Sequence, residues 1–362
     1  MMGSAAFGRA DRHIAGAVLG ATAVVLLAMA LLMTLFALLD ELQESADGYG
    51  FVEALWYCGL TLPRRIYEVL PYAVFLGALI GLGSLANHRE LVALRAAGMS
   101  PWRIFRGVAL GTLLFMGAGL WLGEVTAPSG EARAEVYKQQ IEQSSVSLSF
   151  TGGYWYREGP LYMNVEGLSP SGELLGVRQY HYDGTNKLQV ARYAERAIYD
   201  AQARGWRLFE VQETRFGSEK VATHLADEWI WHGQATPRLL SASVLLEPRK
   251  LSISDLRYQV AYMEREGLGS GRYQVSFWSK VMQPLAVLGL ALLSLAFVLG
   301  PLREVSIGVR LSVGVLAGLA FKYLQDLFAP MSLVYDLPSW LAVLIPIVVC
   351  WVVSAVAIRA AA

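Results

Sequence analysis

Residues Ile14–Leu39, IAGAVLGATAVVLLAMALLMTLFALL, contain no charged side chain. As a helix, the 26 residues of this stretch would extend roughly 39 Å, which exceeds the hydrocarbon core of a bilayer, about 30 Å thick. A cleavable signal peptide has an apolar region of only about 7–15 residues and a small-residue cleavage site. Here the apolar stretch continues directly into Asp40 and Glu41. It therefore predicts a retained membrane-spanning helix.

The rest of the chain repeats this pattern. Of 362 residues, 55% are hydrophobic and 17% are charged, and the mean hydropathy is +0.40, which excludes a wholly soluble or disordered protein. The fifth predicted span is the weakest, because Arg310 opens it and Lys322 interrupts it, although both side chains could snorkel to an interface. The other predicted spans are Val69–Asn87, Gly107–Gly123, Val281–Leu302, Val309–Phe321 and Leu337–Ile358, which makes six in all.

The short flanks of these spans predict the orientation of the chain. With the N-terminus inside, nine arginines flank the spans on the cytoplasmic side, and only three basic residues lie on the other side. The positive-inside rule therefore favours cytoplasmic N- and C-termini. Three spans precede the charge-rich segment, so it lies outside, which in a bacterium with two membranes means the periplasm.

This segment differs in composition from the rest of the chain. Residues Glu131–Lys250 hold 15 acidic and 14 basic side chains, 29 of the 60 charges, and no cysteine. Between Ser145 and Leu246, short runs of alternating polarity such as Trp206–Val211 are separated by turn residues, which predicts an antiparallel sandwich or jelly roll. The helical patterns Glu131–Gln143 and Ser254–Glu266 would join it to the spans. We expect three parts: residues 1–128 with spans one to three, 129–268 with the inserted all-β domain, and 269–362 with spans four to six.

Sequence motifs of enzymes are missing. The chain has no phosphate-binding Gly-x-x-x-x-Gly-Lys-Ser/Thr loop, no His-Glu-x-x-His and no Gly-x-Ser-x-Gly. The three histidines of the β segment, His181, His224 and His232, lack metal-ligand spacing. We expect a chain that is not an enzyme, holds no metal or cofactor and does not hydrolyse ATP by itself.

The loop between spans two and three predicts a short cytoplasmic helix at about residues 87–98. Asn87 could cap it with Glu90 at its third position, Gly98 suits its left-handed end, and Ser100-Pro101 suits the start of the next helix. In ATP-driven transporters, a helix of this kind sits in a groove of a separate nucleotide-binding subunit. The alternative is that Glu90 only caps the helix and that the nearby arginines only obey the positive-inside rule.

The sequence resembles the LptF/LptG family of lipopolysaccharide export permeases, and its LptG members more closely than its LptF members. The resemblance covers essentially the whole chain. The stretches that carry it are Asp11–Ile14, Glu90-Leu91, Ala97-Gly98, Gly123-Glu124, Ala127-Pro128, Leu251–Ser254, Gly271–Gln274, Trp278–Lys280, Gln283-Pro284, Gly300–Arg303, Gly308–Arg310 and Leu333–Tyr335.

The resemblance implies a fold and a set of partners. The family has six spans and a periplasmic β-jelly roll between the third and the fourth. LptF and LptG pair, two copies of the ATPase LptB bind the ATP and dock on the loop helices, and the single span of LptC packs beside a lateral gate. Lipopolysaccharide then passes towards the periplasmic bridge LptA. The residues that the resemblance assigns to ATPase coupling are Arg89, Glu90, Leu91, Leu94 and Arg95.

The resemblance also implies contacts with the substrate. Family members carry lysines near the outer end of span one, but this sequence has Ala37, Gln43 and Glu44 there. The substrate-binding residues that we expect are Arg64 and Lys138, for the anionic phosphates, together with Phe321 at the end of span five and Leu324 just after it. An LptF-like half of the same complex and a membrane-anchored scaffold that recruits periplasmic partners are the alternative functions.

Overall fold

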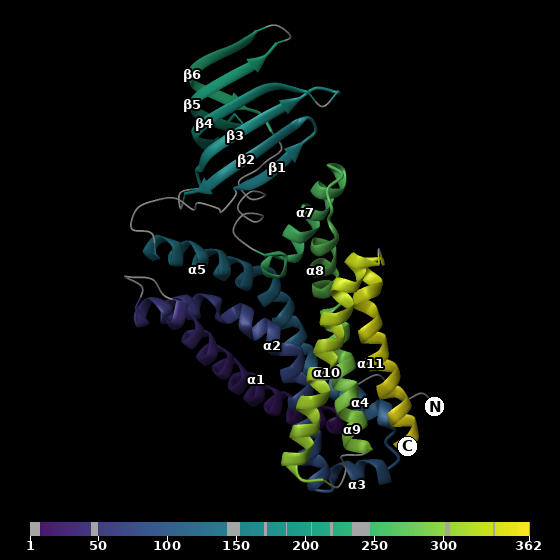
Figure 1. Cartoon of the computed structure of the whole chain (residues 1–362). Helices are drawn as coiled ribbons and strands as arrows, with labels where there is room; N and C mark the ends of the chain where they lie inside the picture. The colour runs from purple at the N-terminus through teal and green to yellow at the C-terminus, as the bar shows by residue number, and fades with distance from the viewer. Residues whose placement is uncertain are drawn as a thin grey trace.

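A computed structural model of the chain describes residues 8–44, 50–142, 153–169, 172–185, 187–203, 205–217, 220–233, 247–300, 305–335 and 337–361. Long helices pack side by side, and an antiparallel sheet stands at one end of them (Figure 1). This arrangement confirms the predicted α-helical membrane protein with an inserted all-β domain. The helices of the first part are α1 (Arg9–Glu44), α2 (Phe51–Asn87), α3 (Glu90–Ala96), α4 (Pro101–Trp121), the π-helical turn η1 (Leu122–Thr126) and α5 (Ala127–Glu142).

The helices after the sheet are η2 (Pro248–Lys250), α7 (Ile253–Arg265), α8 (Gly271–Val281), α9 (Gln283–Leu299), α10 (Ile307–Val334) and α11 (Ser339–Ala361). Among the described residues, five helical stretches are long and apolar enough to cross a membrane, and α8 with α9 makes a sixth if the pair is one span. These two helices meet at an angle of 52°. The predicted fourth span, Val281–Leu302, coincides with α9, and α8 precedes it.

Several helices continue past charges at which the sequence pattern predicted an end. Helix α2 begins 18 residues before the predicted second span, at Phe51 instead of Val69, and contains Arg64, which pairs with Glu68 and Glu131. Helix α10 runs on past Lys322, whose Nζ lies 2.5 Å from an oxygen of Asp326 one turn later. Ion pairs of this kind satisfy the charges, so the helices need not stop there.

Glycines set how closely the first helices approach one another. A Cβ on Gly77 of α2 would lie 2.3 Å from the Cα of Thr22 on α1, and one on Gly111 of α4 would lie 2.7 Å from the carbonyl oxygen of Ala15. The first half of α1 is thus held between α2 and α4, in the close backbone packing that small residues allow in lipid. Gly16 and Gly20 are spaced in the same way, but open space surrounds them. The four-residue spacing of the glycines therefore does not by itself predict which of them lie at a helix interface.

The described strands form one six-stranded antiparallel sheet in chain order, in which each strand pairs with the next. Tyr156, Met163 and Trp206 belong to its buried core, against which Tyr262 of α7 packs. The strands are β1 (Tyr154–Glu158), β2 (Leu161–Leu168), β3 (Leu174–Tyr182), β4 (Leu188–Asp200), β5 (Gly205–Phe216) and β6 (Val221–Trp231).

One tyrosine fastens the sheet to the connecting helix α7. The ring of Tyr262 stacks on that of Tyr156, with centroids 5.2 Å apart. Its hydroxyl donates to the carbonyl of Arg157 at 2.6 Å and accepts from the N–H of the same residue at 3.2 Å. Burial raises the pKa of both tyrosines, which keeps the hydroxyls protonated as donors.

Tyr262→Phe tests this attachment. The substitution keeps the stacked ring but leaves two backbone groups of Arg157 without a partner, which costs about 1–3 kcal/mol. We expect faster amide hydrogen exchange in β1. Tyr258→Phe on the exposed side of the same helix is the control and should change nothing. Equal exchange in the two variants would show that stacking alone holds α7.

Candidate coupling and substrate-contact sites

The loop helix α3 lies at the end of the helical bundle opposite the sheet, beside the start of α1 and the end of α11 (Figure 1). The prediction of a short helix here is confirmed, but its capping box was wrong. Helix α2 continues through Asn87, the left-handed residue Arg89 (φ 63°) precedes α3, and Glu90 is the first helical residue. Gly98 is left-handed (φ 83°) as expected, and the Ser100 hydroxyl accepts a hydrogen bond from the N–H of Arg103 at the start of α4.

Two side-chain contacts hold the start of α1, one to the loop helix α3 and one to α4. An Oε2 of Glu90 lies 2.6 Å from Nε2 of His13 on α1. Two residues earlier, the fully buried Asp11 meets Arg106 of α4 at 2.6 Å and also accepts the N–H of Gly8. A displacement of α3 would therefore act on α1 through the Glu90–His13 contact, while the Asp11–Arg106 pair joins α1 to α4.

The predicted coupling residues divide between two faces of α3. Leu91 is 3% exposed and lies in the helical core, and Leu94 packs against that core. Arg95 is half-buried, whereas Arg89 is exposed and the side chain of Glu90 is 44% exposed. The exposed face that a partner could contact also contains Val92, Ala93, Ala96 and, on α4, Trp102. The sequence could have indicated the exposed residues of α3, because they lie on the side of the helix away from the apolar Leu91 and Leu94.

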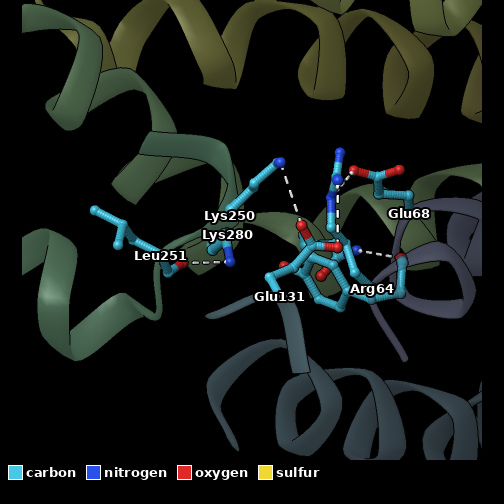
Figure 2. Close-up of polar contacts among 8 residues, drawn as sticks. Arg64, Glu68, Glu131, Lys250, Leu251 and Lys280 are labelled. Atoms are coloured by element: carbon cyan, nitrogen blue, oxygen red, sulfur yellow. Dashed lines mark hydrogen bonds and ion pairs between the residues drawn. The ribbon is translucent and has the colours of Figure 1, made fainter. Parts of the chain in front are cut away.

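A second cluster lies where the connectors of the sheet meet the membrane helices, and we call it the junction (Figure 2). Its centre is Glu131 of α5, which is 2% exposed. One carboxylate oxygen accepts from Arg64 of α2 at 3.4 Å, and the other lies 3.3 Å from Nζ of Lys250 in η2. Arg64 also bonds Glu68 at 2.9 Å. One buried acid thus joins α2, α5 and the segment that leaves the sheet domain.

The same segment is fixed at two further points of the junction. Lys280 of α8, 6% exposed, donates to the carbonyl of Leu251 at 2.6 Å (Figure 2). The Glu124 carboxylate of η1 accepts the N–H groups of Ile253 and Ser254 at 2.8 and 3.2 Å. These N–H groups have no partner within α7, and the positive end of the helix dipole adds to the attraction. The start of α7 is therefore anchored to η1 and α8.

The four predicted substrate residues lie in different settings. Arg64 belongs to the junction. Lys138 of α5 lies 2.6 Å from Glu41 of α1. Phe321 is 6% exposed within a core cluster of α2, α9, α10 and α11, and Leu324 on the same helix is half-buried. Within the described ranges, no group of three or more His, Cys, Asp or Glu side chains could hold a metal ion.

Comparison with known proteins agrees with this architecture. The family described as lipopolysaccharide export system permease LptF/LptG matches residues 12–360. The chain belongs to this family. The lipopolysaccharide export system permease protein LptG of Escherichia coli strain K12 is 33% identical over 342 residues, which cover 94% of this chain and 95% of the relative. LptG of Haemophilus influenzae is 29% identical over 352 residues, covering 95% and 98%.

Several of the stretches that carry the family resemblance meet in the junction of this LptF/LptG permease. Glu124, Leu251, Ile253 and Lys280 make the contacts described above. The side-chain amide of Gln283, at the start of α9, donates to the carbonyl of Tyr67 at 3.3 Å. Glu124 and Gln283, which lie 159 positions apart in the chain, thus belong to one site of this multi-pass inner membrane permease.

Proposed function

We propose that this LptF/LptG permease is the LptG-like half of an ATP-driven exporter. Both relatives reported above are LptG proteins, which favours this half over LptF. Its partners would be an LptF-like permease, an LptB-like ATPase dimer that binds the ATP, an LptC-like single-span protein and an LptA-like bridge. The cargo would be lipopolysaccharide, taken from the inner membrane.

The observation that carries the coupling step is the Glu90–His13 contact between α3 and α1. An ATPase that binds the exposed face of α3 would move Glu90, and the Glu90–His13 contact would move α1 with it. The Asp11–Arg106 pair would carry the motion of α4, the helix that follows α3, to the same end of α1. The loop helix would then transmit the motion of the ATPase to the membrane helices.

The proposed orientation has the sheet domain in the periplasm and both termini in the cytoplasm. The positive-inside count supports it, as does the position of α3 and of the sheet at opposite ends of the bundle (Figure 1). A reporter fusion at Glu195 in β4 should read outside. A cytoplasmic reading there would exclude the periplasmic sheet.

Charge reversal at Glu90 tests the coupling role. We expect Glu90→Lys to insert normally but to lower ATP-dependent lipopolysaccharide transfer at least about 10-fold, since a like charge in a contact costs several kcal/mol. The measurement is lipid transfer and ATP turnover of the purified complex in nanodiscs. Asp40→Lys, an exposed acid near the far end of α1, is the control. Normal transfer by the Glu90 variant would exclude coupling through this residue.

His13→Ala separates docking from transmission. The variant leaves Glu90 available to the ATPase and removes only its tie to α1. We expect the ATPase still to co-purify while lipid transfer per ATP falls. Loss of the ATPase from this variant would instead make His13 part of the docking surface.

A further inference from the structure

Aromatic side chains gather around a cavity on the first three strands of the sheet. The cavity has a volume of about 420 Å³, and we call it the aromatic pocket. It is lined by Trp155 of β1, Tyr162 of β2, and Tyr180 and Tyr182 of β3. These strands form the part of the sheet nearest to the helices (Figure 1). The volume lies within the range of about 300–1,000 Å³ that is usual for small-molecule sites.

The aromatic pocket lies on the face of the sheet opposite to the hydrophobic core. Side chains alternate between the two faces of a strand. Tyr156, Leu161 and Met163, the chain neighbours of Trp155 and Tyr162, are at most 4% exposed and belong to the core. Trp155 itself is 58% exposed. The pocket is therefore not needed to fill the core, and an exposed aromatic surface of this kind marks a contact with another molecule.

The four rings form two pairs with different geometry. Trp155 and Tyr180 are stacked, with centroids 6.1 Å apart and an angle of 23° between the ring planes. Tyr162 and Tyr182 meet edge to face, with centroids 5.4 Å apart and an angle of 79°. The rings offer apolar surface, whereas the tyrosine hydroxyls donate and accept hydrogen bonds and the indole N–H donates. A ligand with one apolar face and a polar rim would satisfy both.

The charge beside the pocket disfavours a cationic ligand. Arg157 of β1 is the register partner of Tyr162, and its guanidinium carbon lies 5.2 Å from the centroid of that ring. A second positive charge nearby would be repelled, and none of the four lining side chains is an acid. The guanidinium carries five N–H donors in a fork, of which one donates to the carbonyl of Gly159. The electrostatics favour a ligand that presents acceptor oxygens.

A peptide strand is the less suitable occupant. Strand addition needs the unpaired N–H and C=O groups of a sheet edge. The pocket instead extends across β2, which pairs with β1 on one side and with β3 on the other, and Tyr162 lies directly opposite Tyr180. The recognition groups are therefore side chains on a sheet face rather than a free backbone edge.

We propose that the aromatic pocket binds a saccharide ring. A pyranose has a face of C–H groups and a rim of hydroxyls. Its C–H face packs on the indole of Trp155, and its hydroxyls exchange hydrogen bonds with the tyrosine hydroxyls and with Arg157. The site is distinct from the core face of the sheet, and the inference does not depend on the proposed function.

Two probes test binding and separate its possible sources. Isothermal titration calorimetry of the full-length permease in nanodiscs measures the affinity for lipid-free oligosaccharide released from lipopolysaccharide by mild acid, and for maltopentaose. We expect the wild type to bind sugar. Binding of the first probe alone would assign the site to the glycan of lipopolysaccharide, and equal binding of both would assign it to free sugars in general. The absence of binding by both would overturn the proposal.

Substitutions at Trp155 show whether the bound sugar lies in the pocket. Trp155→Ala removes an exposed ring, so the fold should persist while the affinity falls at least about 5-fold. Trp155→Tyr keeps a ring and should stay within about 2-fold of the wild type. Tyr193→Ala is the matched control, because Tyr193 is an exposed ring on β4 that does not line the pocket. Equal losses in Trp155→Ala and Tyr193→Ala would overturn the proposal.

Two further probes represent other ligand classes. Choline tests the pocket as a cage for a cation, and a decaproline peptide tests it as a groove for a protein segment. Neither should bind in a way that depends on Trp155. Binding of either one, lost in Trp155→Ala, by a permease that binds no sugar would replace the saccharide assignment.

Discussion

Replacing Gly77 by leucine is expected to separate α1 from α2 and to abolish the stable fold of the helical part. A Cβ at this position would lie 2.3 Å from the Cα of Thr22 and 2.4 Å from its side-chain oxygen. The clash is with backbone, so no side-chain rotation relieves it, and one whole helix must shift. Overpacking of this kind costs about 3 kcal/mol or more.

The measurement is unfolding of the purified permease in mixed micelles, followed by tryptophan fluorescence. Gly20→Leu is the matched control, because Gly20 also lies on a span and a Cβ there would meet nothing within 4 Å. We expect an early transition, or no folded protein, for Gly77→Leu only. Equal transitions in the two variants would mean that α1 and α2 do not pack as described.

Replacing Glu131 by glutamine is expected to loosen the sheet domain from the membrane helices. The change removes the negative charge between Arg64 and Lys250 in a site where the acid is 2% exposed. Removing one partner of a buried ion pair costs about 3–5 kcal/mol. Here the cost arises because Lys250 loses this carboxylate and Arg64 keeps only the half-exposed Glu68. Amide exchange in α7 and in η2 should rise, and lipid transfer should fall while ATP turnover continues.

Glu68→Gln is the control for this prediction. Glu68 bonds the same guanidinium, but its side chain is 50% exposed, so its loss should cost no more than about 1 kcal/mol. Similar exchange rates in the two variants would show that the buried acid does not hold the junction together. The prediction therefore depends on burial rather than on the number of contacts that Arg64 makes.

The junction also changes the interpretation of Arg64. As a basic residue after Pro63, it was expected to meet the phosphates of the substrate. In the structure its guanidinium bonds two carboxylates of the same chain. The sequence contained the charges, but Glu131 is 67 residues away along the chain, and no local pattern indicates such a pairing. Whether Arg64 also contacts lipid stays a prediction.

The sequence by itself determined the features that depend on local physics. An uncharged stretch as long as Ile14–Leu39 has to satisfy its backbone within a helix and bury its side chains in lipid. Alternation of polarity predicted the sheet, and Gly98, Ser100 and Pro101 predicted helix ends that the structure contains. Each of these patterns involves residues that are close together in the sequence, so it can be recognised without the tertiary structure.

Only the tertiary structure decided which charges and which glycines meet. Gly77 is in contact and Gly20 is not, although the two have the same chemistry, because contact depends on which face of a helix meets its neighbour. In the same way, Lys138 lies beside Glu41, 97 positions earlier in the chain. Electrostatic energy depends on distance in space and on burial, and the fold alone sets both.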